Sequence, residues 1–176
     1  MFNKLIGGML VVASTSIYGY MLTKELTNRI IVLKQLKRAF LLLKSEIRYS
    51  METLPDAFIN VSNKFNECEK EIGFFFGRVG ERIKETADIT FKEIWESQVN
   101  ELKKQTNIDG KDGDKLMSLG DGLGYLDVTQ QLNNIDQYIE ALEADIEELS
   151  GKYKESCKLY TSLGVMAGLF LTIILI

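Results

Sequence analysis

Uncharged, mostly apolar residues occupy the two ends of the chain, whereas the stretch between them alternates apolar and polar positions with a helical period. The terminal runs, residues 5–22 and 159–176, are 18 residues each. As helices they are about 27 Å long, close to the roughly 30 Å hydrocarbon core of a bilayer. We therefore predict two transmembrane helices around one domain, residues 23–158, with residues 1–4 as a short extracytoplasmic N-terminus.

Each terminal run has a second interpretation. Lys4, followed by apolar residues and by the small residues Ala13, Ser14 and Ser16, is also compatible with a cleavable signal peptide, although no clear small-x-small cleavage site precedes a polar start. The last run could instead be a buried core helix, but no polar residue follows it before Ile176. We expect the membrane interpretation for both runs.

Basic residues beside the inner ends of the two runs predict the orientation. Only Lys4 lies on the outer side. The inner side carries Lys24, Arg29, Lys34, Lys37 and Arg38 after the first run and Lys152, Lys154 and Lys158 before the second. Because basic residues accumulate on the cytoplasmic side of membrane proteins, we predict a cytoplasmic domain.

Apolar side chains at spacings of three and four predict six helical segments. These are residues 24–50, about 53–66, about 69–85, a segment that includes 91–102, a segment between the polar loop 107–113 and Gly122 or Gly124, and residues 127–176. The fold class that follows is all-α, an antiparallel six-helix bundle flanked by two transmembrane helices. We expect 24–50 to continue the first run and 127–176 to form one rod of about 75 Å.

Local signals support two of the helix starts and one core position. Pro55 lies near the first helical position after Thr53. Thr90 and Glu93 have the spacing of a capping box. Trp95 follows on the apolar face of the same segment, and we expect it to be a core residue and not a binding residue.

Charge predicts which helices pack together. Residues 136–148 carry six acidic side chains and no basic one, whereas residues 24–50 carry seven basic and two acidic ones. In an antiparallel arrangement the facing pairs are Lys34–Glu147, Lys37–Glu143, Arg38–Glu140 and Lys44–Asp136. We predict that these two helices form the spine of the domain. The alternative is two separately solvated charged faces, because exposed ion pairs stabilise little.

Composition argues against nucleic-acid binding and against an enzyme. The chain has 21 basic and 25 acidic residues, and it has no histidine, the most frequent general base and metal ligand. Asp109, Asp112 and Asp114 suggest a calcium loop, but their spacing does not match one, and a polar loop with a helix start is favoured. We predict no catalytic, cofactor-binding or metal-binding residues.

Two groups of residues are candidates for contacts with other helices or proteins. Gly164 and Gly168 have the four-residue spacing that permits close helix packing in a membrane, or they are incidental small residues. Gly120, Gly124 and Asp127 lie at the corner before the last helix, which we expect far from the bilayer, and are candidate partner-binding residues. Their alternative role is structural, with the glycines ending one helix and Asp127 capping the next.

Several segments, in order and spacing, resemble the stage III sporulation protein AB family over nearly the whole chain. The matching segments are the opening apolar run, LKQLKRAFLLLKSEIRY at 33–49, TLPDAF at 53–58, FKEIW at 91–95, SLGDGLGYLDVTQQ at 118–131 and YTSLGVMAGLFLTIILI at 160–176. The sequence departs from the family at Gly73, Gly77 and Gly80 of the third segment and at the 107–113 loop. We therefore make no prediction of how the third to fifth helices pack.

The resemblance implies a function that the residue pattern alone does not give. It implies a membrane protein made in the mother cell of an endospore-forming bacterium, placed in the membrane around the forespore. There it would form part of a secretion-like channel, with a cytoplasmic domain similar to that of the type II secretion F protein and the type IV pilus platform protein. The implied partners are other stage III sporulation proteins, including the companion ATPase, protein AA. The resemblance is also compatible with a homo-oligomer.

The resemblance supplies no catalytic residues and no cofactor, so the expected function is a non-enzymatic assembly platform. The alternative is a stand-alone membrane adaptor or signalling hairpin that uses the acidic last helix as a coiled-coil docking surface.

Overall fold

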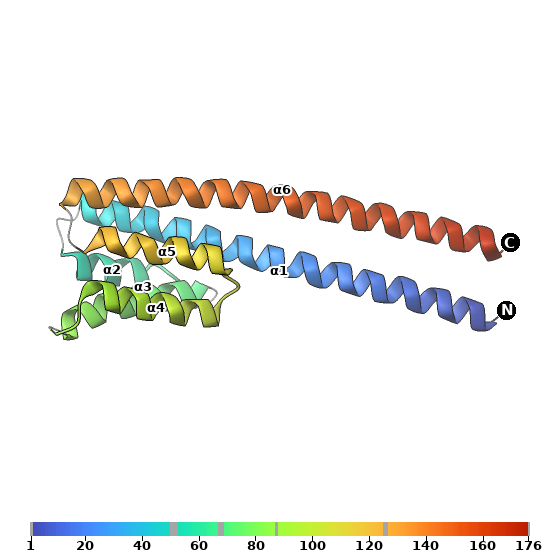
Figure 1. Ribbon diagram of the computed structural model, residues 1–176, viewed down its shortest axis with the longest axis horizontal. Helices are drawn as coiled ribbons and strands as arrows, with labels where there is room; N and C mark the ends of the chain where they lie inside the picture. The colour runs from blue at the N-terminus through green and yellow to red at the C-terminus, as the bar shows by residue number, and fades with distance from the viewer. Residues whose placement is uncertain (1, 50–52, 67–68, 87, 125–126, 176) are drawn as a thin grey trace. The chain divides into compact units, whose positions relative to one another are not determined.

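The structure is a computed structural model that describes residues 2–49, 53–66, 69–86, 88–124 and 127–175, without the side chains of 2–23, 160–161, 163–165 and 167–175. Within these ranges the chain forms six helices and no strand, which confirms the all-α prediction (Figure 1). The helices are α1 (Phe2–Tyr49), α2 (Leu54–Ser62), α3 (Lys70–Glu85), α4 (Phe91–Gln105), α5 (Gly110–Leu123) and α6 (Val128–Leu175). They divide into two compact units, residues 31–146 and residues 1–30 with 147–176.

The two long helices contain the terminal apolar runs. α1 and α6 are each 48 residues long, as their predicted continuity requires, and α6 passes through Gly151 without interruption. Among the residues that the structure describes, no helix combines the length and the apolar character needed to cross a membrane. Apart from Leu159, Ser162 and Met166, the side chains of both runs lie outside the described residues, so the two predicted spans stay a prediction.

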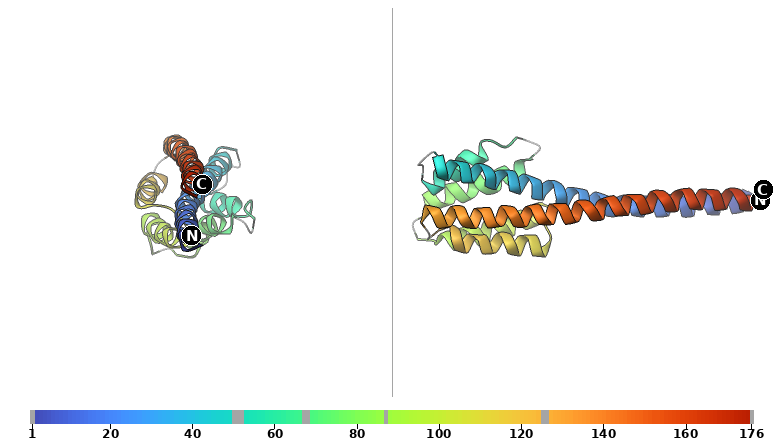
Figure 2. Two further views of the ribbon diagram at one scale, coloured as in Figure 1. Left: turned by 90° about the vertical axis from the view of Figure 1, so that its right-hand side faces the viewer. Right: turned by 90° about the horizontal axis from the view of Figure 1, so that it is seen from above.

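The first and last helices pack against each other in the unit 31–146, as predicted (Figure 2). Lys37 Nζ lies 2.8 Å from a carboxylate oxygen of Glu143, and Lys44 forms an ion pair with Asp136. The predicted pair between Lys34 and Glu147 joins residues of the two different units, and it stays a prediction.

The predicted pairing of Arg38 with Glu140 is wrong. Arg38 Nη1 instead lies 2.9 and 2.7 Å from the two carboxylate oxygens of Glu69, which directly precedes α3. Its guanidinium also lies 5.1 Å from the ring centre of Phe65. Arg38 therefore turns toward the α2–α3 connection, because one residue there supplies a carboxylate and another an aromatic face.

Two helix boundaries differ from the sequence prediction. α2 ends at Ser62, before the expected end near Asn66, and Phe65 packs close to Gly73. α5 starts at Gly110, inside the predicted 107–113 loop, because the Asp109 side chain caps the helix by accepting a hydrogen bond from the Asp112 amide at 2.9 Å. Both differences arise from contacts that the hydrophobic period does not encode.

The glycines of α3 permit a close approach of α2. A Cβ atom at Gly80 would lie 2.6 Å from the carbonyl oxygen of Pro55, and one at Gly77 would lie 2.8 Å from Ser62 Oγ. At Gly80 the neighbour is backbone and cannot move aside, so this position requires glycine for packing, whereas the Ser62 hydroxyl near Gly77 can rotate. The helix is nonetheless regular from Lys70 to Glu85, because helix packing offsets the low helix propensity of glycine.

The core of the 31–146 unit is built around Trp95, which is fully buried, as the sequence predicts. Its ring centre lies 5.2, 5.7, 6.0 and 6.5 Å from those of Phe75, Phe91, Phe58 and Phe40, respectively. Phe40 in turn makes an edge contact with Tyr138 of α6 at 4.9 Å. Aromatic pairs at these distances stabilise a core beyond the area they bury. One cluster thus connects α1, α2, α3, α4 and α6.

Candidate partner-binding corner between α5 and α6

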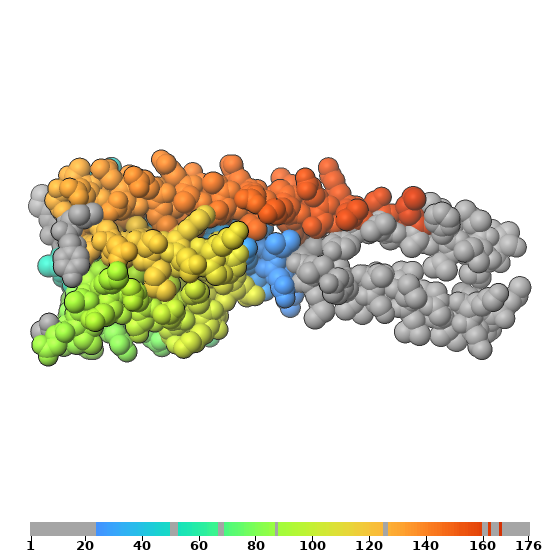
Figure 3. All heavy atoms as spheres, viewed as in Figure 1, coloured from blue at the N-terminus to red at the C-terminus, as the bar shows by residue number. Residues whose placement is uncertain are grey.

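The corner contains the three residues predicted from the sequence and one packing contact that explains the first of them. Gly120 is buried on α5 beneath Trp95 of α4, and α4, α5 and α6 follow one another across the face in Figure 3. A Cβ atom at Gly120 would lie 2.2 Å from Trp95 Cδ1. Trp95 Nε1 donates a hydrogen bond of 2.8 Å to the Leu116 carbonyl oxygen, which fixes the indole against α5. Gly120 therefore supports packing and is not exposed to a partner.

Gly124 is exposed at the C-terminal end of α5. A Cβ atom there would meet the Phe91 ring at 2.9 Å, and Phe91 stacks on Trp95. Gly120 and Gly124 are one helical turn apart, so both accept an aromatic side chain of α4. No signal in the sequence identified these two aromatic partners, because they lie on another helix.

Asp127 is exposed and caps α6. Its side chain accepts a hydrogen bond of 2.9 Å from the Gln130 amide, and its carbonyl oxygen accepts one of 3.0 Å from the Gln131 amide. The structural role that the sequence offered as the alternative is therefore present for Gly124, the C-cap of α5, and for Asp127, whereas Gly120 lies inside α5 and does not end it. Partner binding stays a prediction, and only Gly124 and Asp127 present exposed atoms for it.

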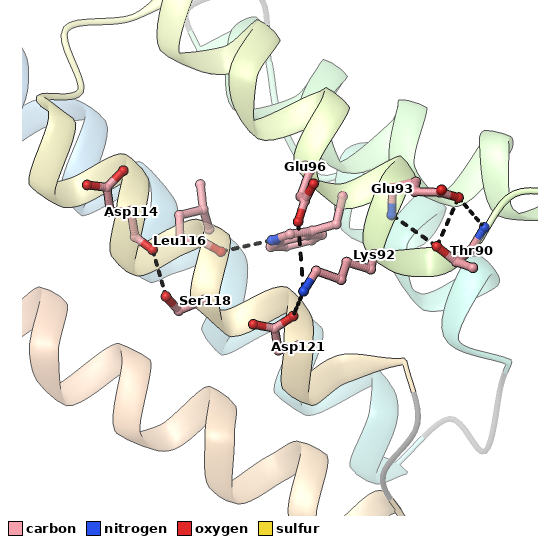
Figure 4. Close-up of polar contacts among 9 residues, drawn as sticks. Thr90, Lys92, Glu93, Glu96, Asp114, Leu116, Ser118 and Asp121 are labelled. Carbon is pink, nitrogen blue, oxygen red and sulfur yellow. Dashed lines mark hydrogen bonds and ion pairs between the residues drawn. The ribbon is translucent and has the colours of Figure 1, made fainter.

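An ion pair connects α4 to α5 at the edge of the corner (Figure 4). Lys92 Nζ lies 2.8 Å from a carboxylate oxygen of Asp121 on α5 and 4.0 Å from one of Glu96 on its own helix. The hydrogen bond to Asp121 raises the pKa of Lys92. Because Lys92 and Asp121 are exposed, this pair positions the two helices more than it stabilises them.

The predicted capping box at the start of α4 is confirmed (Figure 4). The Glu93 amide donates to Thr90 Oγ1 at 3.3 Å, and the Thr90 amide and hydroxyl each donate to the Glu93 carboxylate at 3.0 Å. These hydrogen bonds favour the ionised carboxylate and lower the pKa of Glu93. The cap fixes the residue at which α4 begins and hence the direction of every side chain on it.

The remaining candidates do not form a chemical centre in the described part of the chain. Gly164 and Gly168 lie outside the residues whose side chains are described. Among the described residues, no group of three or more His, Cys, Asp or Glu side chains is arranged to hold a metal ion. The contacts at the corner provide helix capping, close packing and exposed charge.

Comparisons with known proteins agree on one family. The family model described as stage III sporulation protein AB matches residues 4–176. The stage III sporulation protein AB of Bacillus subtilis (strain 168) is 26% identical over 175 residues, which cover 98% of each chain. A solved structure of a stage III sporulation protein AB superimposes with a TM-score of 0.64 at 19% identity, over 72% of this chain and 97% of that one. At this identity the structural match concerns the fold alone.

Proposed function

We propose, because the chain belongs to the stage III sporulation protein AB family, that it is a non-enzymatic membrane platform of a secretion-like channel between mother cell and forespore. The family assignment makes it a sporulation protein, and neither the family description nor the name of the relative indicates a catalytic activity. The observation that carries the proposal is the extent of the family match, residues 4–176, which includes the helical domain and both terminal apolar runs.

In this proposal, residues 5–22 and 159–176 cross the membrane and residues 23–158 lie in the mother-cell cytoplasm. The absence of charge from both runs and the basic residues beside their inner ends support this placement. The arrangement along the chain supports it as well, because the helices that include the two runs are α1 and α6, the first and the last. Both ends of a single helical domain would then be fixed at one membrane surface.

The proposed partners are other stage III sporulation proteins, and a secretion-type ATPase is the proposed partner on the cytoplasmic side. The exposed end of α5 at Gly124 and the exposed carboxylate of Asp127 are the proposed contact point. The carboxylate combines a negative charge with a fixed direction, because its cap at α6 holds it in place.

The contacts of α6 disfavour the stand-alone adaptor as an alternative. That function needs acidic side chains of α6 available to a partner. Three of them instead bind lysines of the same domain: Asp136 binds Lys44, Glu143 binds Lys37 and Asp145 binds Lys115. The last pair is 2.6 Å long and joins α5 to α6. These carboxylates hold the helices of the domain together and leave less negative charge for docking.

The proposal is tested by copurification of the full-length protein from sporulating cells. We expect the tagged protein to stay in the membrane fraction after alkaline carbonate extraction and to capture the sporulation ATPase after mild detergent solubilisation. Recovery in the aqueous fraction contradicts the membrane assignment. Retention in the membrane with capture of only a regulatory protein favours the adaptor.

The variant Asp127→Asn separates docking from capping. Asparagine is as good an N-cap as aspartate, so the melting temperature should change little, while the negative charge is lost. If the carboxylate docks the ATPase, this variant captures less of it than the wild type does. Unchanged capture would assign Asp127 to the helix cap alone.

A further inference from the structure

A shallow depression that is open to solvent lies between α3 and α4. Phe74 of α3 lies at this depression with 58% of its surface exposed, although Phe75 and Phe76 beside it are buried. Leu102 of α4 supplies a buried apolar part of the lining. A large aromatic side chain next to a lined depression is typical of a contact surface.

Gln98 of α4 borders the same depression and is only 5% exposed. None of the hydrogen bonds formed by the described residues involves its side-chain amide. No buried polar side-chain atom lacks a hydrogen bond among the described residues, so the amide of Gln98 is in contact with solvent at the depression. The Gln98 amide therefore has a donor and an acceptor available for a group that enters the depression.

The charged residues at the depression are arranged by sign. α3 and α4 pack against each other and are joined by the short connection 86–90, so they run antiparallel. Arg78 and Gln98 lie toward the connection, whereas Glu71 and Glu101 lie farther from it. Neither Arg78 nor Glu71 has an ion-pair partner among the described residues. One end of the depression therefore presents hydrogen-bond donors and positive charge, and the other presents negative charge.

We propose that this depression docks an amphipathic helix of another protein, whose exposed face carries an acidic, a large apolar and a basic side chain on successive turns. The apolar side chain covers Phe74 and Leu102. The acidic side chain accepts hydrogen bonds from Arg78 and the Gln98 amide, and the basic side chain pairs with Glu71. A helix fits because side chains one turn apart on one face match the spacing along α3 and α4.

The shape of the depression favours contact with the surface of a protein over a small-molecule ligand. Sites for small molecules commonly enclose about 300–1,000 Å³, whereas this depression is shallow and open to solvent. The proposal is independent of ATPase docking at Asp127, because the residues of the depression and those of the corner are different. The failure of one therefore leaves the other intact.

The experiment places a photo-crosslinking phenylalanine analogue at Phe74 of the full-length protein in sporulating cells. We expect an adduct whose partner segment, mapped by mass spectrometry, is a helix with an acidic, an apolar and a basic side chain on successive turns. The same analogue at Leu41 of α1, which is 47% exposed, is the control for random contacts. No adduct at position 74, or an adduct with lipid, with a second copy of this chain or with a segment lacking those charges, overturns the proposal.

Two variants in the crosslinking background distinguish docking from a structural role. Gln98→Leu replaces an amide that forms no hydrogen bond with the described residues by an apolar group of similar size, so the melting temperature should change little. The adduct should fall about tenfold, because hydrogen bonds to a charged group are lost. Arg78→Glu should also reduce the adduct, and Arg78→Lys should retain most of it. An adduct that persists in Gln98→Leu contradicts the role assigned to the amide.

Discussion

Trp95 and Gln98 lie one turn apart on α4, both with little exposed surface, and their polar groups differ in whether the domain supplies a hydrogen-bond partner. The Trp95 indole is fully buried and donates to the Leu116 carbonyl oxygen at 2.8 Å. Gln98 is 5% exposed, and its amide forms no hydrogen bond with the residues that the structure describes but is in contact with solvent at the depression. The fold itself satisfies the first group, so we assign it to stability. The second group has no such partner, and we assign it to recognition.

The surroundings of the two residues differ in the same way. Beside Trp95, α5 has a glycine, Gly120, and its lack of a side chain leaves space for the indole. Around Gln98 a neighbouring aromatic side chain, Phe74, remains exposed and the space is left open. Substitutions on the Trp95 side should therefore lower stability strongly, whereas those on the Gln98 side should affect stability little and binding more.

The largest effect is expected for Gly120→Ala. The added methyl group would lie 2.2 Å from Trp95 Cδ1, and the buried ring has no room to move away. We expect a loss of about 3 kcal/mol in the free energy of unfolding, measured by urea denaturation followed by circular dichroism. Gly151→Ala is the matched control, because nothing lies within 4 Å of a Cβ atom there. A similar stability of both variants would contradict the close packing.

A smaller loss is expected for Trp95→Phe. This change removes the hydrogen bond to Leu116 and part of the ring volume at the centre of the aromatic cluster, so we expect a loss of about 2 kcal/mol. The same denaturation assay measures it, without tryptophan fluorescence, since the chain has one Trp. A loss below about 0.5 kcal/mol would mean that the indole N–H contributes no more to the free energy of unfolding than the Gln98 amide, which forms no hydrogen bond with the described residues.

The capping box, which sets the direction of both faces of α4, predicts a pH effect. The hydrogen bonds from Thr90 lower the pKa of Glu93 in the folded protein below its ordinary value of 4.5. Their contribution to stability is therefore fully present above the unfolded pKa and is lost as the pH falls through the folded pKa. Glu93→Gln keeps the cap but cannot titrate. We expect a smaller decrease of melting temperature between pH 6 and about pH 3 in the variant. Parallel melting profiles would refute the assignment.

The smallest effect on stability is expected for Phe74→Ser. Because this side chain is 58% exposed, the free energy of unfolding should change by less than about 0.5 kcal/mol. Its buried neighbour Phe75 is the matched control, since Phe75→Ser removes a ring 5.2 Å from Trp95 and should destabilise the domain strongly. An equally large loss in both variants would place Phe74 in the core and remove its role in docking.

Several features of the fold could be predicted from local sequence. The helical period gave the six helices, the Thr90 and Glu93 spacing gave the start of α4, and opposite charges gave the pairing of Lys37 with Glu143. The start of α5 was not predicted, because the Asp109 cap lies within a polar, glycine-containing stretch that has no hydrophobic period. Arg38 was assigned to the wrong carboxylate, because charge patterns do not distinguish one acidic residue from another.

The sequence by itself determined what depends on neighbours along the chain: helix positions, the cap of α4, the burial of Trp95 and the family resemblance of residues 4–176. Only the tertiary structure decided which polar groups of the interior acquire partners on another helix. Trp95 and its acceptor are 21 residues apart, and Gly120 is explained only by a ring on another helix. Hydrogen bonds and close packing depend on distances in space, so the difference between Trp95 and Gln98 appears only once the helices are placed side by side.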